Sequence, residues 1–264
     1  MGTDILSRIV EHKKEEVAAA KKRLPENRLR TEAMIPRKRR SFMNQLLPKG
    51  PSSINIIAEI KRASPSKGLI RQDLDPVRYA LEYENGGAAA LSVLTDRTYF
   101  KGSFEDLQKA REVSTLPVLR KDFMISSYQL YESSVLEADA VLLIVRILSQ
   151  EQLRDYLNLS HELEMDAMVE IHSEKDFETA TRAGAKLIGI NNRNLSSFET
   201  NIDTAIRMAS LMEPYQTAVA ASGIQKRKDI EKICASGICN FLVGESLVRA
   251  ENPKVFLKSL LGIQ

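Results

Sequence analysis

The sequence predicts a (β/α)8 barrel, an α/β fold, formed by residues 1–264 as one domain. Three observations predict this fold. The length is typical of a single barrel, which usually needs about 250 residues. Apolar strand-like runs recur roughly every 20–30 residues from Ile54 onwards, each followed by a helical pattern, as in a parallel sheet. Small residues precede several of these runs, as in Ala183-Gly184-Ala185, which suits the tight turn from a helix into a strand.

The alternation of apolar and helical patterns gives eight expected strands. They are Ile54–Ile60, Ala89–Leu94, Leu116–Leu119, Ala140–Val145, Ala167–Ile171, Lys186–Ile190, Thr217–Ala221 and Cys239–Val243. Eight strand–helix units in a chain of this length indicate a closed barrel. An open doubly wound sheet is the alternative, but no Gly-x-Gly-x-x-Gly turn supports it.

The start of the chain carries only helical patterns, and we interpret residues 1–50 as a helical N-terminal extension. Apolar residues spaced along one helix face predict a helix from Asp4 to about Lys22, which Pro25 ends. A second amphipathic stretch lies near 27–34, and the basic run Arg37–Arg40 follows it. We expect this extension to pack against the barrel.

Composition favours a cytoplasmic protein without a metal. Hydrophobic residues make up 43% of the chain and charged residues 28%, which is typical of a soluble globular protein. The net charge of +3 is too small to imply nucleic acid by itself. Cys234 and Cys239 fail zinc-site spacing and form no disulfide framework, so we expect reduced cysteines. No apolar run reaches the ~18 residues of a membrane span, and the charged N-terminus is unlike a secretory signal.

Charged and polar residues lie where several expected strands end. The carboxyl ends of barrel strands gather at one mouth, where the active sites of this fold lie. Glu59 and Lys61 share one face of the first strand, and burying them costs several kcal/mol unless they are paired or functional. A salt-bridge network that only closes the barrel is the alternative, but such clusters on this fold favour function. The candidate catalytic residues are Lys121, Glu170, Lys61, Glu59 and Asn191.

Glycine-containing turns follow the last two expected strands, at Ser222-Gly223 and Gly244-Glu245. Glycine lets backbone N–H groups approach an anion, and these two loops form the usual phosphate site of this fold. The loop 64–68 after the first strand adds hydroxyls and a cation near the same mouth, and it could also close over a ligand. The sequence therefore predicts a phosphate site beside the catalytic residues.

Apolar side chains near the strand ends could sandwich a flat ring. Phe100 and Phe123 lie in the loops after the second and third strands, with Leu142 and Leu195 near later strand ends. An apolar wall beside polar groups is typical of a ligand pocket. The three histidines are scattered and form no triad or metal cluster in the sequence, so we predict no metal.

Long motifs lie on successive expected strands: Glu59–Ser66, Leu94-Thr95 with Tyr99-Phe100, Leu119–Phe123, Ile188–Leu195, Ser222–Ile224 and Leu242–Leu247. Together these motifs resemble those of the indole-3-glycerol phosphate synthase family. The similarity extends over nearly the whole chain, including Ile9–Lys14 of the extension. The resemblance implies a lyase of tryptophan biosynthesis, within aromatic amino-acid biosynthesis.

The resemblance also implies a reaction. Such an enzyme closes the indole ring of 1-(2-carboxyphenylamino)-1-deoxyribulose 5-phosphate and releases CO₂ and water, with no cofactor. Lys121 would be the general acid at the substrate carbonyl, and Glu170 the general base in the later dehydration. Lys61 would neutralise an anionic part of the substrate and could share the acid's role, while Glu59 and Asn191 would orient these groups.

Further residues are implied in binding by the same resemblance. Substrate contacts would come from Ser64, Phe100, Phe123, Leu142, Arg193, Leu195, Ala221 and Ser222. The backbones of Ser222, Gly223, Gly244 and Glu245 would hold the phosphate.

Ala221 departs from the family pattern, which usually has glutamate at this inward-facing end of the seventh strand. The change removes a hydrogen-bond acceptor and a negative charge next to the lysines. We expect it to leave Lys61 or Lys121 unpaired and harder to keep charged. The resemblance therefore implies weakened substrate positioning or catalysis, with the other catalytic residues in place.

Other interpretations remain open. Another phosphate-binding barrel, such as phosphoribosylanthranilate isomerase, would need an acid–base pair other than Lys121 and Glu170. A non-catalytic phosphate-ligand-binding barrel derived from the synthase is supported only by Ala221. The basic run Arg37–Arg40 lacks interleaved aromatics and any nucleic-acid reading motif, so we interpret it as an exposed, solvated linker. We expect a monomer that binds a small phosphorylated substrate, and neither nucleic acid nor a membrane.

Overall fold

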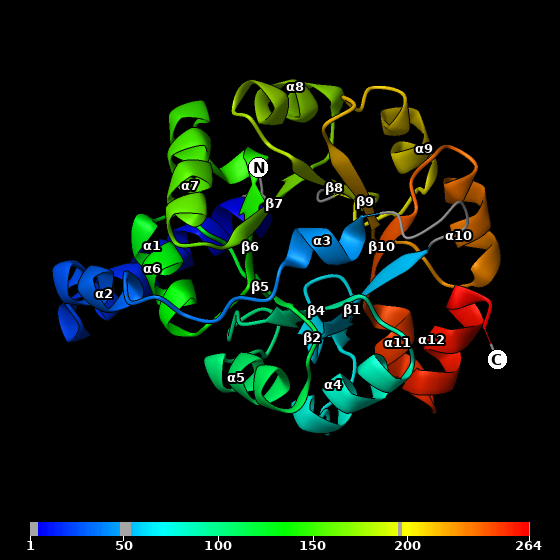
Figure 1. The fold of residues 1–264 in the computed structure, drawn as a ribbon, viewed down its shortest axis with the longest axis horizontal. Helices are drawn as coiled ribbons and strands as arrows, with labels where there is room; N and C mark the ends of the chain where they lie inside the picture. The colour runs from blue at the N-terminus through cyan, green and yellow to red at the C-terminus, as the bar shows by residue number, and fades with distance from the viewer. Residues whose placement is uncertain (1–4, 48–53, 195–196, 264) are drawn as a thin grey trace.

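A computed structural model describes residues 5–47, 54–194 and 197–263. Within these residues, parallel strands close into a barrel in the order β1-β10-β9-β8-β7-β6-β5-β4, which confirms the predicted fold. Figure 1 shows the ring of strands with helices around it. The barrel strands are β1 (Asn55–Ile60), β4 (Ala90–Leu94), β5 (Val118–Lys121), β6 (Ala140–Ile144), β7 (Asp166–Ile171), β8 (Leu187–Asn191), β9 (Thr217–Ala221) and β10 (Asn240–Val243).

The predicted strand bounds differ most from the structure at β5. The sequence predicts a strand at Leu116–Leu119, but pairing with β4 begins at Val118 and continues to Lys121. Pro117 has no N–H group to donate to a neighbouring strand, so it cannot lie inside a central strand. Lys121 is therefore the last residue of the strand itself, held by the sheet, instead of lying two residues beyond its end.

Helices alternate with the strands and cover the outside of the barrel (Figure 1). Side-chain caps start many of them: Asp75 accepts from the backbone N–H of Val77, with Pro76 as the predicted first helical residue. After β1, the short strands β2 (Ala63–Ser64) and β3 (Gly68–Leu69) form a small antiparallel sheet. The helices are α4 (Pro76–Asn85), α5 (Phe104–Val113), α6 (Ser127–Val135), η1 (Val145–Ile147), α7 (Gln150–Glu162), α8 (Glu174–Arg182), α9 (Asp203–Ala209), α10 (Arg227–Cys234), α11 (Glu245–Arg249) and α12 (Pro253–Leu261).

Among the residues that the structure describes, three helices precede the barrel: α1 (Ile5–Arg23), α2 (Glu26–Ala33) and α3 (Phe42–Leu46). The predicted first helix and second stretch are confirmed. In Figure 1, α3 crosses the centre of the ring of strands. The buried side chains of Phe42 and Leu46 join the core inside the barrel. The side-chain amide of Asn55, at the start of β1, donates to the carbonyl of Leu46 at 3.3 Å, so α3 closes the amino-terminal end of the barrel.

The sequence predicts an exposed linker at Arg37–Arg40, and this prediction is wrong for Arg37, Arg39 and Arg40, which are half-buried. The guanidinium of Arg39 donates to the carbonyl of Ala138 at 3.0 Å. The guanidinium of Arg40 donates to the carbonyl of Leu116 at 2.8 Å. Carbonyls at helix ends and in the turns that follow need donors, and arginine side chains supply them here. The run therefore ties the extension to the barrel.

The described ranges contain neither a membrane-spanning helix nor a cluster of metal ligands. No helix there is both long and apolar enough to cross a bilayer. No group of three or more His, Cys, Asp or Glu side chains in those ranges could hold a metal ion. Cys234 and Cys239 are free and half-buried.

Candidate active site

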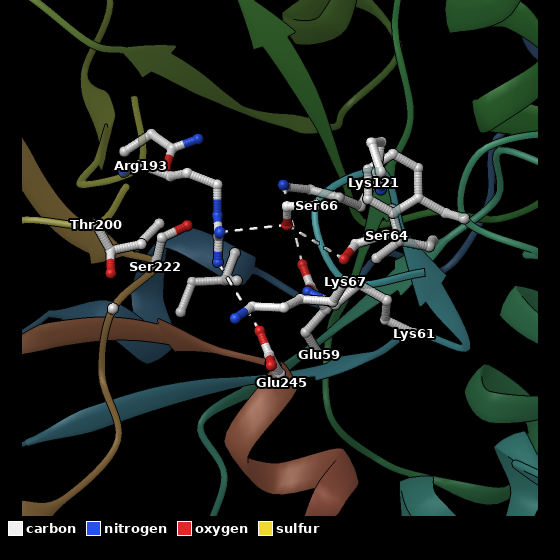
Figure 2. A pocket seen from close by; sticks show the side chains of 18 of the residues that line it. Glu59, Lys61, Ser64, Ser66, Lys67, Lys121, Arg193, Thr200, Ser222 and Glu245 are labelled. Atoms are coloured by element: carbon white, nitrogen blue, oxygen red, sulfur yellow. Dashed lines mark hydrogen bonds and ion pairs between the residues drawn. The ribbon is translucent and has the colours of Figure 1, made fainter. Parts of the chain in front are cut away.

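A cavity of about 620 Å³ opens at the carboxyl ends of the strands, opposite the end that α3 closes. Polar side chains from several strands point into it (Figure 2). Leu195 lies outside the described residues. All the other predicted site residues line the cavity: Glu59, Lys61, Ser64, Phe100, Lys121, Phe123, Leu142, Glu170, Asn191, Arg193, Ala221, Ser222, Gly223, Gly244 and Glu245.

Alternation along β1 brings Glu59 and Lys61 to the cavity. Glu59 is 3% exposed, and one of its carboxylate oxygens is ion-paired and hydrogen-bonded with Nζ of Lys61. Burial raises the pKa of Glu59, but Lys61 and Lys121 outweigh this effect and hold the pKa below its usual value. A Cβ at position 244 would clash with the Glu59 carboxylate and lie 3.0 Å from Nζ of Lys61, so a larger residue there would force this ion pair to shift. The absence of a side chain at Gly244 thus leaves room for the Glu59–Lys61 ion pair.

The ammonium of Lys121, at the end of β5, lies between two carboxylates. Its Nζ is 3.9 Å from Oε2 of Glu59 and 3.7 Å from Oε2 of Glu170. Burial lowers the pKa of Lys121, but Glu170 and Glu59 outweigh it and leave the pKa above its usual value. Lys121 is therefore protonated at neutral pH and can donate a proton to a ligand in the cavity.

This pairing corrects one expectation about Ala221. The sequence suggests that the missing family glutamate leaves Lys61 or Lys121 unpaired and harder to keep charged. In the structure Lys61 pairs with Glu59, and Lys121 lies near both Glu59 and Glu170. Carboxylates from other strands therefore supply the charge balance that position 221 lacks. Ala221 itself is 5% exposed and faces the cavity.

Glu170, on β7, is oriented by its neighbour on β8. The side-chain amide of Asn191 donates to Oε1 of Glu170 at 3.2 Å. The carbonyl oxygen of the same amide accepts from the backbone N–H of Arg193 at 3.0 Å, which fixes the amide's orientation. Oε2 of Glu170 remains directed toward Lys121. The carboxylate thus has one oxygen anchored and one beside the candidate acid.

Arg193 brings a cation to the other side of the cavity. Its guanidinium donates to Oγ of Ser66 at 3.2 Å and lies 3.9 Å from the carboxylate of Glu245. Figure 2 shows these contacts, together with the Ser64 hydroxyl 3.5 Å from that of Ser66. A guanidinium beside hydroxyls is suited to bind a phosphate or carboxylate group.

The turn after β9 has an unusual backbone. Ser222 (φ 70°) and Gly223 (φ 80°) are both left-handed, a conformation that is costly for serine. The side-chain amide of Asn192 donates to the carbonyl of Ser222 at 3.1 Å and holds the turn. A Cβ at position 223 would lie 3.2 Å from the side chain of Thr200, so glycine also suits the close approach of that segment. Such turns can direct successive N–H groups at an anion.

The apolar wall that the sequence predicts is present. The rings of Phe100 and Phe123 are 6.0 Å apart between centroids and tilted by 41°. Leu142 lines the same cavity and is nearly fully buried. This wall and the polar groups of β1 and β5 enclose one space, so a ligand with a flat ring and anionic groups would fit it.

Sequence reasoning missed the part that α1 plays. Ile5, Leu6 and Ile9 of this helix line the cavity. One turn further along, Lys13 is buried, and its Nζ lies 3.0 Å from carboxylate oxygens of both Asp96 and Asp122. The spacing of positions 6, 9 and 13 along one helix face was the signal available in the sequence. It could not show that this face covers the mouth of a barrel.

The arrangement as a whole provides a proton donor, a candidate base and an anion-binding end around one cavity. A family model described as indole-3-glycerol phosphate synthase matches residues 6–260. The chain is 56% identical over 259 residues to the indole-3-glycerol phosphate synthase of Desulfosudis oleivorans, covering 98% of each chain. It is 48% identical over 260 residues to that of Syntrophobacter fumaroxidans, again covering 98% of each.

Similarity to solved structures supports the barrel fold alone. Thiamine phosphate pyrophosphorylase from Pyrococcus furiosus has a TM-score of 0.59 at 14% identity, covering 79% of this chain and 94% of that one. The family model and the two relatives, in contrast, extend over almost every residue that builds the cavity. This chain therefore belongs to the indole-3-glycerol phosphate synthase family.

Proposed function

We propose that this chain forms indole-3-glycerol phosphate with Lys121 as the general acid and Glu170 as the general base. Members of the family are decarboxylating lyases of tryptophan biosynthesis. The observation that carries the proposal is the position of the Lys121 ammonium, between Glu59 and Glu170 inside the cavity. A protonated lysine there can deliver a proton to a substrate carbonyl that is excluded from bulk water.

The proposed reaction begins with ring closure. The aryl carbon that bears the carboxylate attacks the ribulose carbonyl, and Lys121 donates a proton to the carbonyl oxygen, which becomes a hydroxyl. Loss of CO₂ then leaves its bonding electrons on the ring and restores aromaticity. Lys61, at the same mouth, would offset the negative charge of the carboxylate before it leaves.

Dehydration completes the indole. Glu170 takes a proton from the new ring as the hydroxyl group departs, and a protonated lysine gives that hydroxyl the second proton it needs to leave as water. Asn191 supports this role because it anchors Oε1 of Glu170 and leaves Oε2 beside Lys121. The flat ring would lie against Phe100 and Phe123.

The phosphate would lie at the opposite end of the cavity. Arg193 would supply the cation, and the backbone turns at Ser222-Gly223 and Gly244-Glu245 would supply N–H groups. The carboxylate of Glu245 lies 3.9 Å from the guanidinium of Arg193, so an incoming phosphate would have to displace this pairing. Ser64 would contribute its hydroxyl from the loop after β1.

The direct test is a fluorescence assay of indole-3-glycerol phosphate formation with the full chain. We expect turnover that requires only the substrate. A chain that binds the substrate without converting it would refute the proposal and favour the non-catalytic barrel, for which Ala221 is the supporting feature. Conversion of phosphoribosylanthranilate instead would favour the isomerase alternative.

Restoring a carboxylate at position 221 should improve catalysis. We expect Ala221→Glu to raise kcat/KM about tenfold, because a charged hydrogen bond worth about 1.5 kcal/mol would orient the substrate. Ala221→Gln is the matched control, with nearly the same size and no charge. Steady-state kinetics of the three proteins decide the point. Equal or lower kcat/KM in Ala221→Glu would show that the family glutamate is dispensable in this site.

We also propose that the protein acts as a cytoplasmic monomer. Side chains of one chain, from α1 to α11, supply the cavity lining in the described ranges, and the two cysteines there are free. Sedimentation across a concentration series should give the mass of a single chain, 29.6 kDa, with constant specific activity. A dimer whose dissociation on dilution reduces activity would contradict the proposal.

A further inference from the structure

His172 is a buried polar residue to which the proposed mechanism gives no role. It follows the last residue of β7, two positions beyond Glu170, so both side chains lie on the same face of that strand. The His172 side chain is only 3% exposed, and Nε2 lies 3.5 Å from Oε1 of Glu170. The backbone N–H of His172 donates to the carboxylate of Asp176 at 2.9 Å, which fixes the residue at the start of α8.

Neither ring nitrogen of His172 has a hydrogen-bond partner among the described residues. A buried imidazole without a partner costs free energy that an apolar side chain of similar size would not. Oε1 of Glu170 lies 3.5 Å from Nε2, a distance slightly too long for a well-formed hydrogen bond. Catalytic hydrogen bonds are often long in a protein without its ligand and shorten in the complex.

The groups around His172 favour a neutral ring. Arg146 of η1, Asp176 of α8, Lys121 of β5 and Glu170 of β7 are the charged groups that face it. Arg146 and Asp176 pair with each other at 3.1 Å. Burial lowers the pKa of His172, and its cationic neighbours act in the same direction against the two carboxylates. A neutral imidazole can donate one N–H to a carboxylate without cancelling its charge.

We propose that His172 is a positioning residue for Glu170, donating from Nε2 to Oε1 and holding Oε2 toward Lys121 and the substrate. The side-chain amide of Asn191 donates to the same oxygen at 3.2 Å. Oε1 would therefore accept from two donors, one at the end of β8 and one just after β7. With Oε1 held in this way, Oε2 stays beside Lys121, where a general base can reach the substrate. This inference rests on the proposed function, because it concerns the base of that reaction.

Replacing the imidazole with an apolar group should impair the base without affecting binding. We expect His172→Leu to lower kcat about tenfold to a hundredfold, as expected when a catalytic group is misplaced by a fraction of an ångström to an ångström. KM should stay within about threefold, because His172 does not line the cavity.

Two further variants separate hydrogen bonding from packing. His172→Gln keeps a side-chain N–H group that can reach Glu170, so it should recover most of kcat. His172→Asn fills the site with a shorter amide and should resemble His172→Leu. His161→Gln, on the exposed surface of α7, is the matched control and should behave as wild type. Circular dichroism melts check that each variant is folded.

The outcomes are distinct. If wild type and His161→Gln turn over while His172→Leu has normal kcat, His172 has no role in positioning. If His172→Gln and His172→Leu lose the same activity, the residue only fills space and the inference is overturned. Should His172→Leu fail to fold, the comparison of Gln with Asn still decides. A wild-type chain without turnover would overturn the proposed function and this inference together.

Discussion

Lys121→Ala should lower kcat for indole-3-glycerol phosphate formation by about 10³–10⁴-fold, near the upper range for loss of a general acid. Lys121 is the cation that lies within 4.0 Å of both Glu59 and Glu170. Its removal takes away the proton for the carbonyl oxygen and leaves two buried carboxylates facing each other. Ring closure is the first chemical step, so neither CO₂ nor product should form at an appreciable rate.

Lys121→Arg distinguishes proton donation from charge. Arginine keeps the positive charge between the two carboxylates, but its guanidinium does not release its proton in proteins. If Lys121 is the acid, kcat in Lys121→Arg should stay close to that of Lys121→Ala. If only its charge matters, arginine should restore much of the activity. Stopped-flow fluorescence with saturating substrate measures both variants.

The pKa of Lys121 sets the sign of the pH dependence. Burial alone would lower this pKa, yet Glu170 and Glu59 hold it above the usual value of 10.5. The acid form of Lys121 is therefore present throughout the neutral range and is lost only as pH rises well above it. A loss of the Lys121 ammonium proton between pH 7 and pH 9, followed in the wild-type chain by nuclear magnetic resonance of the lysine side chain, would contradict this assignment of the charged state.

The fold could be predicted from the sequence because alternating patterns are local. Each buried strand of a parallel barrel is a short apolar run, and the residues that end these runs must meet at one mouth. That rule was sufficient to predict that four strands bring together Glu59, Lys121, Glu170 and Asn191. The error at Leu116–Leu119 arose because apolar periodicity ignores the missing N–H of Pro117.

Pairings between distant segments could not be predicted. Lys13 lies within the charged face of a helix in the sequence, but in the structure it is buried against Asp96 and Asp122. The guanidinium of Arg39 similarly donates a hydrogen bond to the carbonyl of Ala138, 99 positions away in the sequence. Such contacts depend on how helices are placed over the barrel, which periodicity does not encode. The same limit explains why Ala221 was expected to leave a lysine unpaired.

Glu170→Gln should block the reaction at a later step than Lys121→Ala does. Glutamine keeps the shape of glutamate and can still interact with Asn191, but it cannot accept the proton that dehydration releases. We expect steady-state kcat to fall about 10²–10⁴-fold, the usual contribution of a general base. In a single turnover, ring closure and decarboxylation should still proceed, because Lys121 remains protonated beside Glu59.

The two variants can therefore be separated by what they release. With enzyme in excess, Glu170→Gln should give a burst of CO₂ that precedes any indole fluorescence, whereas Lys121→Ala should give neither. Glu59→Gln is the matched control, since it also removes one carboxylate from beside Lys121 but leaves Glu170 free to act. In that variant CO₂ and fluorescence should rise together, more slowly than in wild type. If Glu170→Gln also releases both together, or releases no CO₂, Glu170 does not act in dehydration. The two carboxylates near Lys121 would then need their roles reassigned.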